Sequence, residues 1–268
     1  MIIQEKINEA KPIFVIGSPR SGTSIITLAV QSGANIPGYK EGHFLPLAQH
    51  ILDSIEIYYA KNNNSAINCK RTLHHIDKSR LQEQIYAVFR EQYNSLMDQE
   101  VWLDKTPGIN MIKTAPYLLL IWPQAKFIFA KRRGIECIMS RLRKFSGRIS
   151  FEAHCKLWQE CMETWFTIRD QLNGHYIEIE QREIAFNSKA TASQIGSFLE
   201  LEQQKIDRIA DTFANKRTQH TGGGEGLIMM AIEETGWSDE QIAIFRKYCT
   251  KISEKFGYTE SSSYMTNY

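Results

Sequence analysis

The chain alternates short apolar runs with longer segments of helical periodicity. Residues 12–16, PIFVI, form a run that stops at Gly17, and a helical pattern follows over residues 21–32. Residues 125–130, AKFIFA, form a similar run, and apolar side chains then recur at helical spacing over residues 135–142. Runs of this kind are typical of buried strands, and the period that follows them is typical of a helix packed on a sheet. Each unit therefore predicts a strand, a loop and a helix.

Two further runs extend this alternation. Residues 101–105, VWLDK, end at a Thr-Pro-Gly turn, and residues 176–179, YIEI, precede a helical segment that ends at residues 195–199. Strands that alternate with helices favour a parallel sheet covered on both faces. We therefore expect an α/β fold, a three-layer sandwich with a central, mostly parallel sheet and helical insertions.

Two stretches do not fit the alternation. Residues 44–100 are mostly helical with a polar break at residues 62–64, and residues 151–172 form a long amphipathic helix that carries Trp158 and Trp165. We expect both stretches to be helical insertions.

The composition limits where the protein acts and what it binds. Its 268 residues suit one domain over residues 1–268, with a core over about 12–258 and a disordered tail over 260–268. The net charge of +2 gives no global attraction to nucleic acid or to an anionic membrane. No stretch approaches the roughly 20 apolar residues that span a bilayer, and the five cysteines lack a C-x-x-C pair. We therefore expect a cytoplasmic protein with reduced thiols, without a membrane span and without a nucleic-acid partner.

The segment GSPRSGTS, residues 17–24, lies directly between a predicted strand and a predicted helix. Successive backbone N–H groups and the positive end of the helix dipole face a phosphate at such a place. The spacing matches the P-loop pattern G-x-x-x-x-G-K-[ST], except that Thr23 stands in place of the lysine. The positive charge lies earlier, at Arg20, whose planar guanidinium can hold two oxygens of a tetrahedral anion. The loop therefore predicts a fold of the P-loop nucleotide-binding type, with a phosphate site unlike that of an ordinary ATPase.

The segment PRSGTS, residues 19–24, resembles the 5′-phosphosulfate-binding loop of sulfotransferases that use 3′-phosphoadenosine 5′-phosphosulfate (PAPS), in particular the tyrosylprotein sulfotransferase branch. A second motif agrees with the first. Arg132 at a strand end is followed by Ser140 on the next helix, which is the spacing of the family's 3′-phosphate site. The Lys-Thr-Pro turn that begins at Lys105 resembles the lysine-containing turn of the family, and the resemblance covers about residues 12–258.

This resemblance implies an activity and a set of ligands, and we expect the helical stretches at residues 44–100 and 151–172 to cover the acceptor side of the site. The activity is transfer of a sulfuryl group from PAPS to a hydroxyl or similar nucleophile by in-line displacement, with release of 3′-phosphoadenosine 5′-phosphate (PAP). Arg20 and Lys105 are implied to stabilise the transferring group and the bridging oxygen. The residues implied to bind the nucleotide are Arg20, Ser21, Gly22, Thr23, Ser24, Arg132 and Ser140. Arg217, close to His220, is a further candidate for contact with the nucleotide.

Two residues of one loop compete for the role of general base. Glu41 follows the phosphate-binding helix and matches the basic glutamate of the tyrosylprotein branch, while His43 comes two residues later. Either side chain can accept the proton of an attacking hydroxyl. The sequence leaves both open, with Glu41 preferred on the resemblance.

Other interpretations of these residues stay open. A kinase-like P-loop enzyme needs a lysine where Thr23 stands and a magnesium-binding aspartate, for which Asp104 is the candidate. A catalytically silent nucleotide-binding protein that recognises a partner is a second alternative. We expect no metal site, because no histidine or cysteine cluster has metal-ligand spacing and sulfuryl transfer does not require a metal. The acceptor class (small molecule, glycan, lipid or peptide), the adenine contacts, the oligomeric state and the role of the glycine-rich residues 222–226 are left open.

Overall fold

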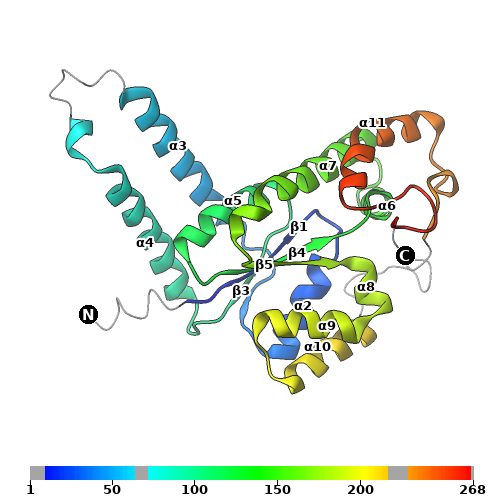
Figure 1. Ribbon diagram of the computed structural model, residues 1–268, viewed down its shortest axis with the longest axis horizontal. Coiled ribbons are helices and arrows are strands. Elements are labelled where there is room, and N and C mark those ends of the chain that lie inside the picture. Colours follow the sequence, from blue (N-terminus) through cyan, green and yellow to red (C-terminus); the bar gives the residue numbers. More distant parts are fainter. Residues whose placement is uncertain (1–9, 64–71, 217–228, 267–268) are drawn as a thin grey trace.

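The computed structural model describes residues 10–63, 72–216 and 229–266. Its centre is a sheet of five strands, β1 (Ile13–Gly17), β2 (Gly38–Tyr39), β3 (Leu103–Lys105), β4 (Lys126–Lys131) and β5 (Tyr176–Glu180). All neighbouring strands are parallel, in the order β2-β3-β1-β4-β5 (Figure 1). The predicted α/β fold with a central parallel sheet is confirmed.

The central strands β1 and β4 are buried on both faces, because their side chains alternate between two cores. Phe14 and Ile16 of β1 belong to one core, whereas Ile13 and Val15 belong to the other. Strands buried on both faces appear in a sequence as continuous apolar runs. This is why the run at residues 12–16 is recognisable from the sequence.

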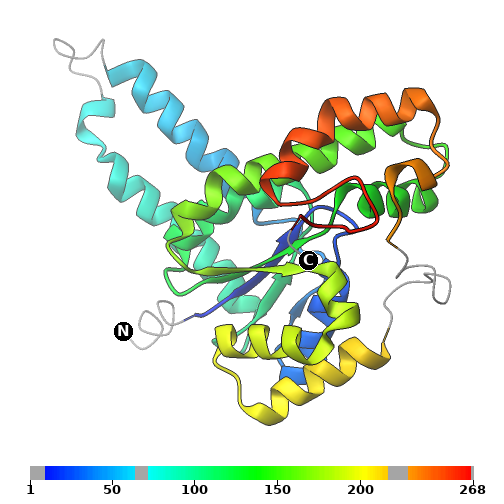
Figure 2. The same ribbon diagram turned by 45° about the vertical axis from the view of Figure 1, so that its right-hand side comes forward.

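Helices pack against both faces and complete the three layers (Figure 2). One face carries α2 (Thr23–Ala34), α8 (Gln181–Phe186), α9 (Ser188–Leu199) and α10 (Gln203–Asn215). The other face carries α5 (Ile109–Ile121), α6 (Gly134–Lys144), α7 (Phe151–Ile168) and α11 (Asp239–Lys255). Short 3₁₀ helices are η1 (Thr72–His75), η2 (Arg169–Leu172) and η4 (Ile232–Glu234).

The strand β2 and the helices α5 and α10 were not predicted from the sequence. β2 has only two residues, which is too short to show any period. α5 contains Pro116 and packs between β1, α3 and α7, so its apolar residues are not confined to one stripe. α10 does carry a signal, because its buried residues Ile206, Ile209 and Phe213 recur at helical spacing.

The predicted helical part between residues 44 and 100 consists of α3 (Pro46–Asn63) and α4 (Lys78–Leu96). The two helices lie side by side and extend away from the sheet (Figure 1). The ring of Phe44, just before α3, lies 5.5 Å from the ring of Phe89 in α4. Neither they nor any other helix in the described ranges is long and apolar enough to cross a membrane. Their expected role as a cover for the acceptor stays a prediction.

The helix α7 packs against the sheet as part of the core, and it is also a candidate cover for the acceptor. The ring of Trp165 stacks on Phe129 of β4 with 4.2 Å between ring centroids. Trp158 is fully buried and donates its indole N–H to the Arg132 carbonyl at 3.1 Å. The tryptophans of the predicted amphipathic helix therefore face the sheet and the end of β4.

The expectation of a disordered tail is wrong for residues 260–266. Tyr264 is 2% exposed, and its hydroxyl donates to Glu180 at the end of β5 at 2.6 Å. Residues 257–266 also form backbone hydrogen bonds with one another, including one from Thr259 N–H to the Tyr264 carbonyl at 2.9 Å. One buried tyrosine anchors the segment. The assignment of the whole chain to a single domain stays a prediction.

Candidate active site

Apart from Ser140 in α6 and Arg217, which is outside the described residues, the predicted site residues lie at or just after the carboxyl ends of four adjacent strands. The phosphate loop follows β1, Glu41 and His43 follow β2, Lys105 ends β3, and Arg132 follows β4. Open parallel sheets bind ligands in the crevice at this edge. The parallel sheet therefore gathers segments that are far apart in the sequence.

The loop between β1 and α2 is fixed on both sides. A Cβ at Gly17 would lie 2.4 Å from the carbonyl oxygen of Ala130 in β4, so only glycine fits. The Gly17 carbonyl accepts a hydrogen bond from Gly108 N–H at 2.9 Å, which ties the loop to the start of α5. The loop therefore sits in a defined position between β4 and α5.

The hydrogen-bond donors of this loop fall into two groups. Ser21 directs its N–H and its hydroxyl at the carbonyl of Ser18, at 3.1 and 2.7 Å, so both donors shape the turn. The first i→i−4 bond of α2 is accepted by the Gly22 carbonyl. The N–H groups of Thr23 and Ser24 precede that bond and face the open end of the helix. In this structure the Ser21 donors are engaged within the loop, and the binding of the nucleotide by Ser21, Gly22, Thr23 and Ser24 stays a prediction.

Arg20 joins the two predicted phosphate motifs. Its φ of 81° lies in the left-handed region, which is unfavourable for a residue with a side chain. Its carbonyl accepts from Nη1 of Arg132 at 3.2 Å, and its own Nε donates to Ser140 Oγ at 3.0 Å. The structure therefore brings together Arg20, Arg132 and Ser140, although 112 and 120 residues of chain separate the last two from the first.

The electrostatic environment of this cluster is strongly positive. Burial and the neighbouring guanidinium groups of Arg132, Arg143 and Arg141 lower the pKa of Arg20. Arg141 donates its Nε to the neutral Nδ1 of His154 at 3.0 Å. Within the described ranges, no ion pair joins any of these four arginines to a carboxylate. Like charges gathered in a partly buried place repel one another, so the cluster favours binding of an anion.

The neighbouring arginine has a different task. Arg133 is 1% exposed, and its guanidinium donates to the carbonyls of Thr259, Ser261 and Met230 at 3.1, 2.6 and 2.8 Å. Its Nε donates to Glu136 at 2.9 Å. Arg133 therefore holds the C-terminal segment, whereas Nε of Arg132 is buried without a hydrogen-bond partner among the described residues.

The two candidate bases form a chain with Lys105. Glu41 Oε1 lies 2.9 Å from Lys105 Nζ, and Glu41 Oε2 lies 3.5 Å from His43 Nε2. The Lys105 side chain is 5% exposed and that of Glu41 is 58% exposed. The Glu41 carboxylate therefore faces solvent, while the Lys105 ammonium that pairs with it is buried. The hydrogen bond from Lys105 lowers the pKa of Glu41. The structure brings these three residues together, and their catalytic roles stay predictions.

Asp104 is not arranged as the magnesium ligand that a kinase-like enzyme needs. It is fully buried, and its oxygens accept hydrogen bonds from Thr106 Oγ1 at 2.9 Å and from the Tyr93 hydroxyl at 3.2 Å. No three His, Cys, Asp or Glu residues in the described ranges are grouped so as to hold a metal ion. Arg217, His220 and the glycine-rich residues 222–226 lie outside the described residues.

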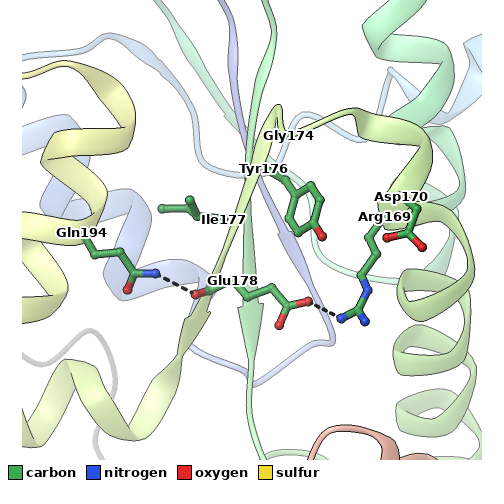
Figure 3. A pocket seen from close by; sticks show the side chains of 7 residues that line it. All are labelled: Arg169, Asp170, Gly174, Tyr176, Ile177, Glu178 and Gln194. Atoms are coloured by element: carbon green, nitrogen blue, oxygen red, sulfur yellow. Dashed lines mark hydrogen bonds and ion pairs between the residues drawn. The ribbon is translucent and has the colours of Figure 1, made fainter.

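A separate cavity of about 510 Å³ opens beside the edge strand β5 (Figure 3). Its lining consists of Arg169, Asp170, Gly174, Tyr176, Ile177, Glu178 and Gln194. Glu178 is paired with Arg169 at 2.9 Å, and its carbonyl accepts from the Gln194 amide at 3.4 Å. None of the predicted site residues lines this cavity, so it is not the candidate active site.

Comparisons with known proteins address the family directly. The sulfotransferase family profile matches residues 12–205. The chain is similar to the solved structure of sulfotransferase STF9 from Mycobacterium avium, with a TM-score of 0.51 and 14% identity over 93% of this chain and 80% of that one. It is also similar to the sulfotransferase domain of the Synechococcus PCC 7002 olefin synthase, with a TM-score of 0.51 and 14% identity over 93% of this chain and 96% of that one. A comparison with curated proteins found no match.

The solved structures bear on the fold of the chain, and the family match bears on its family. At 14% identity, the likeness to solved structures supports the fold alone. The family match covers more than two thirds of the chain and includes the phosphate loop, the Glu41–Lys105 pair and the Arg132–Ser140 motif. On this match, the chain belongs to the sulfotransferase family.

Proposed function

We propose that the protein transfers a sulfuryl group from PAPS to a hydroxyl or similar nucleophile of an acceptor and releases PAP. The observation that carries the proposal is the contact of Arg20 with both Arg132 and Ser140, which joins the phosphate loop to the end of β4. An ordinary P-loop nucleotide requires one phosphate-binding region, whereas PAPS carries phosphates at both the 5′ and the 3′ position. Two anion-binding segments that meet at one arginine suit such a donor.

The residues present fit the donor. Arg132 is mostly buried, and its Nε has no hydrogen-bond partner among the described residues. A buried donor without a partner costs free energy, which a phosphate oxygen would offset. Arg132 and Ser140 would hold the 3′-phosphate, and the N–H groups of Thr23 and Ser24 would hold the 5′-phosphate.

Transfer also requires hydrogen-bond donors or cations that stabilise the negative charge as it develops on the departing 5′-phosphate. The acceptor oxygen forms a bond to sulfur while the bond from sulfur to the bridging oxygen breaks, and the electron pair leaves with the 5′-phosphate of PAP. Arg20 lies within the loop and Lys105 ends β3, the strand beside β1, and we assign these two cations to the bridging oxygen and the transferring group. Their positive charge is fixed before the reaction, so little reorganisation is needed.

Glu41 is the base in this proposal. It is ionised at neutral pH, because the hydrogen bond from Lys105 keeps the pKa of Glu41 below its ordinary value of 4.5. Nε2 of His43 lies 3.5 Å from Oε2 of Glu41 and helps to hold the Glu41 carboxylate in place. The acceptor proton would pass to Glu41 as the oxygen attacks sulfur.

The acceptor side and the compartment belong to the proposal as well. Phe44, with 42% of its surface exposed, follows the base loop and leads into the α3–α4 hairpin. We therefore place the acceptor, whether a small molecule, glycan, lipid or peptide, beside this hairpin. Cys137, Cys155, Cys161 and Cys249 are buried free thiols, which supports a reducing, cytoplasmic compartment.

The test is formation of PAP from PAPS, measured by chromatography, with water, 2-naphthol and a primary alcohol as trial acceptors. The wild-type protein should form PAP faster than an enzyme-free control. Glu41→Gln keeps the shape but not the charge, so its rate should fall by about 10²–10⁴-fold, and His43→Gln should lose less. A protein that binds PAP but never forms it would favour a silent binding protein. Loss in His43→Gln alone would transfer the role of base to His43.

A further inference from the structure

The loop that carries Glu41 and His43, the two candidate bases, is held by a chain of hydrogen bonds that leads into the core. The backbone N–H of His43 donates to Thr106 Oγ1 at 3.2 Å, and the Thr106 hydroxyl donates to Asp104 Oδ1 at 2.9 Å. The Tyr93 hydroxyl donates to the other oxygen, Asp104 Oδ2, at 3.2 Å. Because Thr106 accepts from the backbone, its single proton is directed at the aspartate. The chain therefore runs in one direction, from the loop into the core.

The same aspartate also contacts the loop sterically. A Cβ at Gly42 would lie 2.0 Å from Asp104 Oδ2, so the backbone between Glu41 and His43 rests directly on this carboxylate. His43 then adopts a φ of 52° in the left-handed region, a conformation that needs support from its surroundings. The hydrogen bond to its N–H supplies such support.

The position of Asp104 makes it a rigid support. It lies in β3, which pairs with β1 and β2, and it is aligned with Tyr39, two residues before Glu41. Its side chain is fully buried, and a buried carboxylate is tolerated only when it is hydrogen-bonded. Burial raises the pKa of Asp104, while the bonds from Thr106 and Tyr93 oppose that rise.

Two independent contacts therefore fix the base loop from one strand end. Lys105 holds the Glu41 side chain, and Thr106 holds the backbone of His43. We propose that Thr106 and Asp104 are positioning residues that set the orientation of the Glu41–His43 loop toward the reacting sulfur, without contact with PAPS or the acceptor. This inference rests on the proposed function. A misplacement of about 1 Å at a catalytic group costs up to about 10²-fold in rate.

A pair of variants at Thr106 tests the inference. Thr106→Val keeps the shape but removes the hydroxyl, whereas Thr106→Ser restores it. PAP formation from PAPS should fall by about 10-fold to 100-fold in Thr106→Val and stay within about threefold of wild type in Thr106→Ser, with PAP affinity nearly unchanged in both. Thr212→Val is the matched control, because Thr212 is a buried threonine of α10 whose hydroxyl donates to a helical carbonyl at 2.9 Å. It should leave the rate unchanged.

Hydrogen exchange gives a readout that does not depend on activity. The His43 amide should exchange faster in Thr106→Val than in wild type, and Thr106→Ser should restore slow exchange. Normal exchange and normal turnover in Thr106→Val would overturn the inference. If the wild-type protein neither binds PAP nor forms it, the proposed function fails, while the exchange experiment still decides whether the hydrogen-bond chain holds the loop.

A second variant covers the case in which Thr106→Val does not fold. Gly42→Ala retains every polar group of the chain but inserts a methyl group against Asp104. It should reduce PAP formation by at least about 10-fold and keep PAP affinity within about threefold. Turnover within twofold of wild type in a folded Gly42→Ala protein would contradict the inference.

Discussion

Arg132 and Arg133 follow β4 side by side, yet their environments give them opposite tasks. Arg133 uses its guanidinium on backbone carbonyls and Glu136. Arg132 makes one hydrogen bond to the Arg20 carbonyl and has a buried Nε without a partner among the described residues. The chemistry of the residue type is the same, so the difference comes entirely from what each side chain meets.

Because of this contrast, we expect substitution of Arg132 to weaken nucleotide binding and substitution of Arg133 to lower the stability of the fold. Arg132→Ala should weaken PAP binding by about 1.5–3 kcal/mol, the range for hydrogen bonds to charged groups, and should change AMP binding little. Arg133→Ala should instead lower the free energy of unfolding by about 3–5 kcal/mol, because it leaves buried partners unpaired. Calorimetric titration and urea unfolding measure the two quantities. Equal weakening of PAP and AMP in Arg132→Ala would show that Arg132 only supports the loop.

The pairing of Glu41 with Lys105 predicts how the Glu41 carboxyl group titrates. Its pKa is lowered chiefly by the hydrogen bond from Lys105, so the carboxylate should stay ionised down to pH values below 4.5. In Lys105→Met that bond is lost, and the titration midpoint should move upward toward 4.5. Side-chain carboxyl NMR of the ligand-free protein measures both midpoints, with Glu41→Gln to assign the signal. An unchanged midpoint in Lys105→Met would refute the pairing of the two residues.

Secondary-structure elements contribute to the site mainly through their ends. The carboxyl end of β1 supplies the phosphate loop, β3 supplies Lys105, and the end of β4 supplies Arg132. The end of β5 supplies no predicted ligand. Glu180 at that end instead accepts hydrogen bonds from Tyr258 and Tyr264 at 2.5 and 2.6 Å. These bonds attach the segment after α11 to the sheet, next to the arginine pair that ends β4.

The C-terminal segment should therefore be a measurable part of the stability. The Tyr264 hydroxyl also accepts from Arg133 N–H at 3.2 Å, so Tyr264→Phe removes a partner from two buried groups. The free energy of unfolding should fall by about 1–3 kcal/mol in urea. Tyr248→Phe is the control, since the Tyr248 hydroxyl donates to the solvent-exposed Glu152 and its removal should change stability little. Equal stability of Tyr264→Phe and wild type would contradict the anchoring of this segment.

At the scale of the whole molecule, local patterns predicted most of the fold. The strand, loop and helix units around residues 17 and 132 are continuous in sequence, so their periodicity identifies them. The pairing of Arg132 with Ser140 at one phosphate site was expected from the family resemblance, whereas the contact of Arg20 with both residues was not predicted. A parallel sheet explains it, because parallel strands place their carboxyl ends at one edge.

What the sequence did not predict depends on single tertiary contacts. The engagement of both Ser21 donors within the loop follows from the position of one carbonyl. The order of residues 260–266 follows from Tyr264 reaching Glu180 across 84 residues of sequence. The support of Gly42 by Asp104 depends on the register of β2 against β3. Neither composition nor periodicity contains such information.

Binding of a nucleotide with a 3′-phosphate at this site can be tested by thermal unfolding. PAP at about 100 times its dissociation constant should stabilise the protein by about 2.7 kcal/mol, which raises the melting temperature by roughly 5–11 °C for a chain of this size. The shift should appear without added magnesium. AMP, which lacks the 3′-phosphate, and ATP with magnesium should give much smaller shifts at the same concentration. Equal shifts with PAP and AMP, or none with PAP, would contradict the assignment of Arg132 and Ser140 to a 3′-phosphate.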